Sequence, residues 1–267
     1  MKKLFIFGDV HSFYDELMEA LNDAGFDRDD NDHIIVSLGD LCGRGNKSRE
    51  VLKFINSLPE ERKICIIGNH ELLMEDLIKR GASYGYDISN GTMATLEQLT
   101  CIYGHERSAI SEMKTNESWA KYKKSWRWYY EIDNYIFVHG WIPFIHSKER
   151  FTTEYFKPLP NWRNASVKQF EDATWENGME AWSKGIREEG KTIFCGHWHT
   201  SWGHCHLHNN GVEFVEEAET RTFNEETGRY IPYTDFSPFI DEGIVALDAC
   251  TAYTHKVNVH VLKIEEI

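Results

Sequence analysis

Residues that can bind a metal follow short apolar runs along this chain. Residues 4–7 lead into Asp9 and His11, and residues 34–38 lead into Asp40. Carboxylate and amide oxygens mixed with imidazole nitrogens suit manganese, iron or zinc better than magnesium alone. The pattern therefore predicts a metal centre of this kind. Later apolar runs end in the same way, at Asn69, His139, His197 and His199.

The stretch from Ile34 to Gly45 combines this metal chemistry with anion chemistry. Its apolar half is too short for a helix and rich in β-branched residues, which is typical of a buried parallel strand. Asp40 follows at the carboxyl end of the strand, where open α/β sheets bind their ligands. Gly43 and Gly45 let the backbone approach a ligand, and Arg44 adds a fixed cation. The stretch predicts a metal beside a bound anion.

The spacing of apolar residues predicts the elements that position these side chains. Each of the first apolar runs is followed by a helical pattern, so the chain should begin with strand and helix in alternation. Gly81 is expected to end the third helix. The expected strands are 4–7, 34–38, 64–67, 135–138, 192–195, 244–247 and 256–264. The expected helices are 13–25, 51–58, 72–80, 93–99 and 170–182.

Two sections interrupt this alternation. A helical insert is expected at about 82–131, and its aromatic residues should pack the insert onto the sheet rather than stack on a ligand. These aromatic residues are Trp126, Trp128, Tyr129 and Tyr130. A long polar loop section is expected at about 201–242. Its alternating His204, His206 and His208 suggest a polar loop strand rather than a third metal site.

Composition limits the classes of protein to which the chain can belong. Twenty-nine basic against forty-three acidic residues give a formal charge of -14, which opposes general binding to nucleic acids or anionic membranes. The cysteines form no C-x-x-C pair, as in proteins that keep reduced thiols. The first apolar run ends at Gly8-Asp9, too early for a signal or membrane segment. We expect a cytoplasmic protein with a single domain over residues 1–267.

The ordered motifs of this chain resemble those of the calcineurin-like metallophosphoesterases. The G-N-H-E form and the R-G pair resemble the serine/threonine protein phosphatase branch of that superfamily. Within the branch, the bacterial, bacteriophage and diadenosine-tetraphosphatase-like members are the most similar. The motifs are Gly8-Asp9-Val10-His11, Gly39-Asp40-Leu41-Cys42-Gly43-Arg44-Gly45, Gly68-Asn69-His70-Glu71, Val138-His139-Gly140 and Gly196-His197.

This resemblance implies a fold and a set of ligands. The fold would be an α/β two-sheet β-sandwich flanked by helices. Asp9 and His11 would bind one of two divalent metals, Asp40 would bridge both, and His199 would be a further ligand of the first. The metals are expected to be Mn²⁺, with iron and zinc as alternatives. The ligands of the second metal would be Asn69, His139 and His197.

The resemblance also implies a mechanism. Metals roughly 3.5–4 Å apart lower the pKa of a bridging water. The resulting hydroxide would attack phosphorus directly. Arg44 and Asn69 would hold phosphate oxygens, and His70 would protonate the leaving oxygen.

The chain departs from the family pattern at Gly43. Members of this branch usually have an aspartate there, which orients the G-N-H-E histidine, so His70 lacks its expected carboxylate partner. Asp248 resembles a late family segment, and it could support the site from outside the ligand set or cap a turn. The family usually supplies a second phosphate-binding arginine. The candidates for it are Arg150, Arg163 and Arg187.

Three functions are compatible with these residues. The first is metal-dependent hydrolysis of phosphomonoesters, with phosphoproteins among the candidate substrates. The second is cleavage of a dinucleoside polyphosphate such as diadenosine tetraphosphate. The third is a catalytically silent, metal-bound interaction module, against which the full ligand set argues. The partner would therefore be a phosphoprotein or a nucleotide, and its identity is expected to depend on residues 84–130 and 201–242.

Overall fold

Two five-stranded sheets form the centre of the protein. The computed structural model describes residues 1–147, 155–214, 223–224, 229–230 and 234–265. The first sheet has the order β14-β1-β2-β3-β4, in which β1 to β4 are parallel and β14 is antiparallel to β1. Its strands are β1 (Lys2–Phe7), β2 (His33–Ser37), β3 (Lys63–Ile66), β4 (Trp126–Arg127) and β14 (His260–Ile264).

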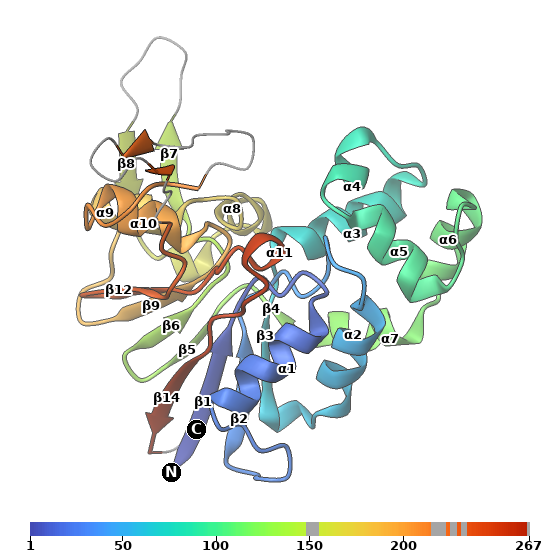
Figure 1. Ribbon diagram of the computed structural model, residues 1–267, viewed down its shortest axis with the longest axis horizontal. Helices are drawn as coiled ribbons and strands as arrows, with labels where there is room; N and C mark the ends of the chain where they lie inside the picture. The colour runs from blue at the N-terminus through green and yellow to red at the C-terminus, as the bar shows by residue number, and fades with distance from the viewer. Residues whose placement is uncertain (148–154, 215–222, 225–228, 231–233, 266–267) are drawn as a thin grey trace.

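The second sheet has the order β12-β13-β9-β6-β5, with parallel strands at its centre. Its outer strands β12 and β5 are antiparallel to their neighbours. Its strands are β5 (Tyr130–Ile132), β6 (Tyr135–Phe137), β9 (Thr192–Cys195), β12 (Phe239–Asp241) and β13 (Ile244–Ala246). Figure 1 shows the two sheets side by side, with helices on their outer faces. The predicted two-sheet sandwich flanked by helices is confirmed.

Side-chain alternation explains why the sheets pack in this way. Leu4 and Ile6 of β1 belong to the core between the sheets, where they join Phe137 and Phe194 of the second sheet. The intervening Phe5 belongs to a separate core beneath the helices, because successive side chains of a strand point to opposite faces. Both faces of β1 are therefore buried, and the polar residues after it can only emerge at its end.

Helices cover the outer face of each sheet. Those of the first sheet are α1 (Tyr14–Asp23), α2 (Ser48–Ser57) and α3 (Asn69–Arg80). Gly81 ends α3 in the left-handed conformation, as the sequence indicated. Those of the second sheet are α8 (Val167–Ala173), α9 (Gly178–Ser183) and α10 (Thr200–His206). The helix predicted at 170–182 is thus two helices, because Asn177 caps a new one by accepting from Met179 and Glu180.

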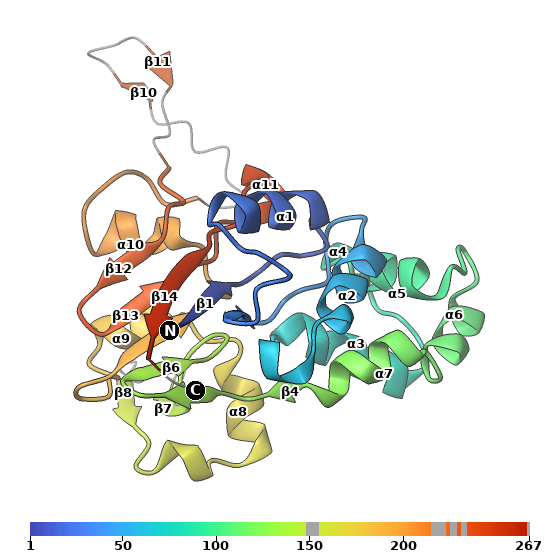
Figure 2. The same ribbon diagram turned by 90° about the horizontal axis from the view of Figure 1, so that it is seen from below.

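The section predicted as a helical insert contains four helices. They are α4 (Gly85–Ser89), α5 (Thr92–Thr100), α6 (Glu106–Met113) and α7 (Glu117–Lys124). Figure 2 shows them projecting to one side, away from the second sheet. Trp119, Tyr122 and Trp126 meet edge to face and belong to the core of the first sheet. Trp128 and Tyr129 instead pack on the second core, through Phe170.

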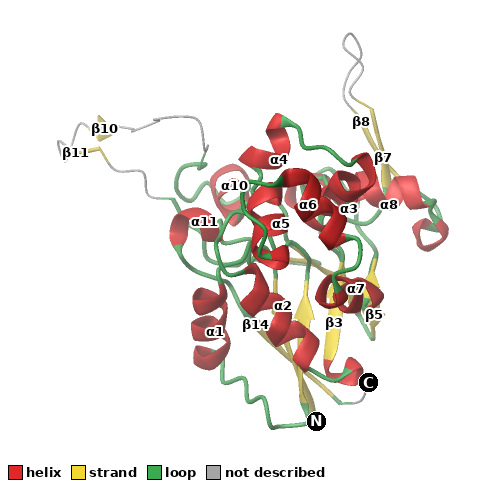
Figure 3. Ribbon diagram, turned by 90° about the vertical axis from the view of Figure 1, so that its right-hand side faces the viewer, coloured by secondary structure: helices red, strands yellow, loops and turns green. Residues whose placement is uncertain are grey.

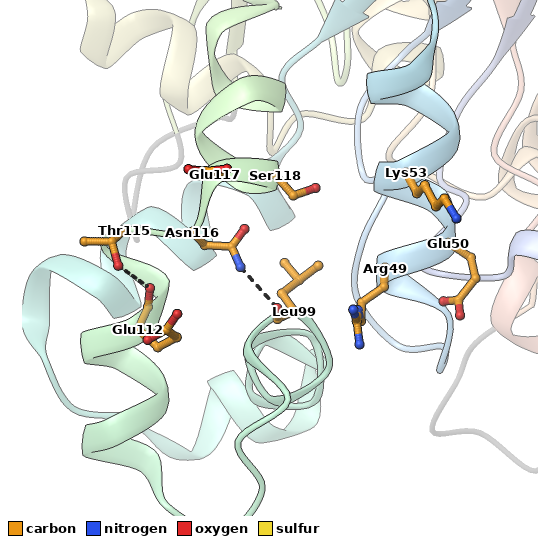
Figure 4. Close-up of a pocket in the computed structure, with 9 residues that line it drawn as sticks. All are labelled: Arg49, Glu50, Lys53, Leu99, Glu112, Thr115, Asn116, Glu117 and Ser118. Carbon is orange, nitrogen blue, oxygen red and sulfur yellow. Dashed lines mark hydrogen bonds between the residues drawn. The ribbon is translucent and has the colours of Figure 1, made fainter.

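A hollow of about 840 Å³ lies between α2 and the turn that joins α6 to α7. Figure 4 shows Arg49, Glu50 and Lys53 on one wall, with Asn116 donating to the Leu99 carbonyl on the other. Both basic and acidic side chains line it, so the hollow is not a site for ions of one sign.

The remaining elements connect and border the two sheets. Lys2 pairs with Ile264, which places the described chain ends together at one end of the strands (Figure 3). The terminal strand starts at His260, later than predicted. Among the described residues, no helix has both the length and the apolar character needed to cross a membrane. The smaller elements are η1 (Glu60–Arg62), β7 (Phe144–Ser147), β8 (Tyr155–Pro158), η2 (Trp162–Asn164), β10 (Phe223–Asn224), β11 (Arg229–Tyr230) and α11 (Thr251–Thr254).

Candidate metal centre

Five of the polar residues singled out from the sequence meet where the two sheets end, whereas the Asp9 carboxylate lies outside their ligand groups and accepts from the backbone N–H of His197 at 3.0 Å. Asp40, which follows β2, belongs to two groups of side chains whose ligand atoms lie within 4.8 Å of one another. One group is Asp40 with His11 and His70, and the other is Asp40 with His139 and His197. The first group comes from the first sheet, and both histidines of the second follow strands of the second sheet. Asp40 therefore occupies the position that a bridging ligand needs.

His139 is oriented so that one ring nitrogen faces the centre. Its Nδ1 lies 2.7 Å from the Leu38 carbonyl oxygen, which can only accept, so Nδ1 carries the proton. Burial lowers the pKa of His139 to about 4, so the ring is neutral at pH 7 and Nε2 has a lone pair. That Nε2 lies 2.8 Å from Asn69 Oδ1 and 3.4 Å from Asp40 Oδ1. Three acceptors face one another, and a cation would satisfy all of them.

The carboxylates of the site are crowded as well as buried. Asp9 and Asp40 are almost wholly buried, and burial together with neighbouring carboxylates raises the pKa of both well above the usual value. Asp248 contributes to both shifts and Glu71 is the main carboxylate acting on Asp40. A bound divalent cation would reverse this repulsion. The donor set therefore fits divalent metal ions.

His11 gives a further sign of this fit. Its Nδ1 is buried and has no hydrogen-bond partner, and its Nε2 lies 3.9 Å from Asp40 Oδ2. Burial and the neighbouring His70 and Arg44 lower the pKa of His11 well below the usual value, so the ring is neutral. A neutral imidazole with unused lone-pair capacity is suited to bind a metal.

Four of the residues proposed as ligands have a positive φ angle. A positive φ is uncommon outside glycine, and it persists only where the surrounding structure imposes it. The strained conformations turn each side chain from its strand toward the centre. The φ angles are 55° for Asp9, 48° for His11, 52° for Asp40 and 66° for His197.

Glu71 organises the site, although sequence reasoning did not assign it a role. Its buried carboxylate accepts from the backbone N–H groups of Asp40 at 2.9 Å, Leu41 at 3.0 Å and Gly68 at 2.8 Å. It thereby ties the loop after β2 to the start of α3. Its position as the third residue of α3 after the Gly68 cap is a capping-box signal that could have identified it.

His70 lies at the metal centre as well as beside the Arg44 turn. Its Nε2 is 3.8 Å from Asp40 Oδ2, and its ring is 4.5 Å from the His11 ring. Burial is the largest cause of a shift that lowers the pKa of His70 to about 3, and the neighbouring Arg44 and His139 add to it. A Cβ built on Gly43 would lie 2.8 Å from His70 Nδ1, so the glycine backbone packs directly on this ring.

His199 and Asp248 form a pair at the edge of the centre. His199 Nε2 lies 3.8 Å from Asp248 Oδ2, and among the described residues His199 belongs to neither of the two ligand groups. Asp248 also accepts from the backbone N–H of Cys250 at 2.8 Å. Asp248 therefore caps a turn, as one of the two alternatives from the sequence had it, and its carboxylate also faces His199.

The other candidates lie in different surroundings. Arg163 is paired with Glu131 and Glu188, and Arg187 donates to the Trp182 carbonyl at 3.0 Å. Arg150 falls outside the described residues.

The expected loop strand at the histidine run is wrong, because helix α10 reaches His206. Each of these histidines has a partner of its own. His204 lies 3.1 Å from the Ser237 carbonyl, His206 pairs with Glu213, and His208 with Asp241.

Comparisons with known proteins find relatives that are similar in sequence to part of this chain. A symmetrical bis(5'-nucleosyl)-tetraphosphatase from Psychromonas ingrahamii is 46% identical over 68 residues, which cover 26% of this chain and 24% of the relative. Its counterpart from Proteus mirabilis is 43% identical over 68 residues, 26% of this chain and 24% of the relative. The match thus spans about a quarter of the length of these relatives.

Solved structures share the fold at low identity. A protein serine/threonine phosphatase from Saccharomyces cerevisiae has a TM-score of 0.50 at 15% identity and covers 100% of this chain and 81% of its own. A cold-active protein-tyrosine phosphatase of a psychrophilic Shewanella has a TM-score of 0.52 at 14% identity. The match covers 98% of this chain and 76% of the phosphatase. The model of the calcineurin-like phosphoesterase family matches residues 2–218. The chain belongs to the calcineurin-like phosphoesterase family.

Proposed function

We propose that this protein is a metal-dependent hydrolase of phosphomonoesters, with phosphoproteins among its substrates. The observation that carries the proposal is the place of Asp40 within ligand reach of two histidine groups. A shared carboxylate is what a pair of metal ions requires, and paired ions are typical of phosphatases. The proposed ligands are Asp9, His11, Asp40, Asn69, His139 and His197, with His199 as a further candidate.

Two bound divalent ions, which we expect to be Mn²⁺, would activate a water for attack on phosphorus and offset the charge of the phosphate. Arg44 and Asn69 are proposed to hold phosphate oxygens. His70 is proposed to protonate the leaving oxygen. Burial with Arg44 and His139 lowers the pKa of His70 to about 3, which favours the neutral ring in the free protein, and the negative charge of a bound phosphate would favour the protonated ring.

A cavity of about 670 Å³ beside Arg44 offers space for the group that carries the phosphate. Phe13, Tyr14 and His255 line it, and they offer apolar and aromatic surface for the group that carries the phosphate. Asp15 and Glu16 line it as well, where Asp15 pairs with Lys47 and Glu16 with His255.

Cleavage of a dinucleoside polyphosphate is the second candidate. The observation in its favour is the name of the relatives that match a quarter of this chain. The third candidate, a silent metal-bound module, is opposed by the half-buried Arg44 and by His70 beside the proposed ligands.

The test is product analysis with the Mn²⁺-loaded protein. A phosphopeptide, a 5'-phosphorylated oligonucleotide and diadenosine tetraphosphate are offered in parallel, and released phosphate and nucleotides are measured. Release of phosphate from the monoesters supports the proposal. Symmetrical cleavage of diadenosine tetraphosphate with intact monoesters would establish the second function, and no turnover of any of the three substrates would count against both hydrolytic functions.

We also propose that the chain forms one metallophosphoesterase domain and acts in the cytoplasm. All six cysteines are free thiols, of which Cys42, Cys65, Cys195 and Cys250 are buried. Free thiols are typical of a reducing compartment.

A further inference from the structure

The turn that carries Arg44 is held by buried hydroxyl groups. The backbone N–H of Gly43 donates to Ser12 Oγ at 3.2 Å, and Thr95 Oγ1 donates to the Gly43 carbonyl at 3.3 Å. Ser12 is fully buried and Thr95 nearly so. Both polar groups of the Gly43 backbone are thus bound by side chains, and one of these comes from α5, about fifty residues along the chain.

Ser48 closes these contacts into a ring. Its Oγ lies 2.7 Å from Ser12 Oγ and donates to Thr95 Oγ1 at 3.5 Å. Each hydroxyl has one proton and can also accept, so one direction satisfies every member. The order is Gly43 N–H to Ser12, Ser12 to Ser48, Ser48 to Thr95, and Thr95 back to the Gly43 carbonyl. Bonds in such a ring reinforce one another in a buried site.

A second bond from α5 holds the other end of the turn. Gln98 Nε2 donates to the Gly45 carbonyl at 3.0 Å, and Gln98 Oε1 accepts from the backbone N–H of Ser48 at 2.9 Å. Residues three apart lie on one face of a helix, so Thr95 and Gln98 reach the two sides of Arg44 together.

The start of α5 rests on the backbone of Arg44 itself. A Cβ built on Gly91, which has φ +76°, would lie 2.7 Å from Arg44 N and 2.8 Å from Arg44 Cα. Any side chain there would push the turn away. Backbone packing and two side-chain bonds therefore fix the turn from the same helix.

We infer that α5 positions the phosphate-binding guanidinium, with Thr95 and Gln98 as positioning residues for Arg44. The inference rests on the proposed function, in which Arg44 holds phosphate. At Gly43, φ is +144° and a Cβ would lie 2.7 Å from His11 Nδ1, so the present arrangement has no room for a carboxylate side chain. The turn is instead fixed from the side of the inserted helices. This arrangement assigns to the insert an indirect part in the reaction, through the position of Arg44.

The test begins with Thr95→Val, which keeps the shape of the side chain and removes the hydroxyl. We expect kcat/KM for an aryl phosphate to fall about tenfold, because small misplacements of a binding group are costly. The affinity of the Mn²⁺-loaded protein for inorganic phosphate, measured by calorimetry, should fall with it, while metal content stays at the wild-type level. Thr95→Ser should restore both values.

Thr100→Val is the matched control on the same helix. Its hydroxyl donates to the Leu96 carbonyl within α5 and does not reach the turn. Its kinetics and phosphate affinity should equal those of the wild type. If Thr95→Val does not fold, Gln98→Ala serves in its place, since it removes the bond to the other end of the turn.

A double-mutant cycle with Arg44→Ala separates positioning from general support. If Thr95 acts through Arg44, Thr95→Val should cause little further loss in the Arg44→Ala background. Equal fold losses in both backgrounds, or no loss in the wild-type background, would overturn the inference. Inactivity of the wild type toward every phosphoester would instead refute the proposed function. Activity lost in Arg44→Ala but retained in Thr95→Val and Gln98→Ala would refute the inference alone.

Discussion

The two sheets supply different chemistry to one centre. In the proposed ligand set, the first sheet supplies mainly oxygen atoms, through Asp9, Asp40 and Asn69, and the second supplies imidazole nitrogens, through His139 and His197. The oxygen side is crowded with buried carboxylates whose pKa values are raised, whereas burial lowers the pKa values of the two histidines. Without metal ions, the carboxyl groups of the first side are hard to ionise, whereas the histidines of the second side are neutral. Bound cations should therefore stabilise the first side more than the second.

The sheets also differ in how their residues are held. On the first side, helices reach the ligand loops through buried side chains, such as Glu71 on the backbone of Asp40 and Thr95 on that of Gly43. On the second side, His139 is oriented by a backbone carbonyl of the first sheet, and His197 packs edge to face on Trp175. Substitutions of distant polar residues should therefore harm the first side more.

The largest effect is expected from Asp40→Asn. It weakens the shared ligand without opening a core cavity, so the protein should remain folded while turnover falls on the order of 10³-fold. At least one metal equivalent should be lost, as measured by plasma mass spectrometry after dialysis. Two tightly held ions in an inactive, folded Asp40→Asn protein would separate ligation from catalysis and contradict this prediction.

His70→Ala should damage alkyl phosphate hydrolysis about 100-fold and aryl phosphate hydrolysis far less. Alkyl leaving groups need protonation, and aryl leaving groups need little. The comparison uses phosphoserine peptide and an aryl phosphate, under conditions where chemistry limits the rate and metal content is unchanged. His199→Ala, on the second side, should lower both rates alike. Equal losses for both substrates in His70→Ala would show that His70 is not the leaving-group acid.

Arg44→Ala should lower kcat/KM by about 50-fold with metal content intact. Arg44→Lys should recover part of the loss, because lysine supplies a point charge rather than a planar fork. Arg163→Ala, which removes an ion-paired arginine of the second sheet, is the control and should leave phosphate affinity unchanged. Wild-type kinetics in Arg44→Ala would assign Arg44 to structural support of the turn.

Glu71→Gln should lower the free energy of unfolding by about 2–3 kcal/mol, because the amide turns donors toward backbone N–H groups and leaves at least one of them unpaired in the core. Urea unfolding of the metal-free protein measures this change. Glu176→Gln, at a half-buried pair with His146 beside the second sheet, should change it by less than about 1 kcal/mol. Similar losses of unfolding free energy in Glu71→Gln and Glu176→Gln would contradict the claim that polar residues outside the ligand set matter more on the first side than on the second.

The smallest effect concerns pH and the edge of the second sheet. Arg163 and Lys191 lower the pKa of Glu131 from 4.5 to about 2. A carboxyl group with a lowered folded-state pKa stabilises the protein above its unfolded pKa, and this contribution is lost as pH falls from about 4.5 toward 2.

Because the pair is partly exposed, the loss should be less than about 1 kcal/mol. Glu131→Gln should therefore unfold like the wild type near pH 2 and be slightly less stable near pH 6. A constant difference between the two proteins across this range would show that Glu131 does not contribute through its charge.

Much of the centre could be predicted from the sequence, since strand ends are marked locally by an apolar run and the polar residue after it. Asp40 and His139 are found in this way. Thr95 could not be found, because its role depends on α5 folding back onto a turn about fifty residues earlier. The prediction of a strand around His204 was wrong because the alternating histidines lie in and after a short helix. Each of them has a partner that is distant in the sequence or in another loop, which the local pattern does not indicate.

The most direct test of the account is a Mn²⁺ titration of metal-free protein, followed in parallel by electron paramagnetic resonance and by hydrolysis of an aryl phosphate. A carboxylate shared by two ions places them close enough to couple magnetically. We predict two ions per chain, a coupled signal on filling of the second site, and activity that appears with it. Full activity with a single ion, or two ions with uncoupled signals, would contradict the shared centre at Asp40.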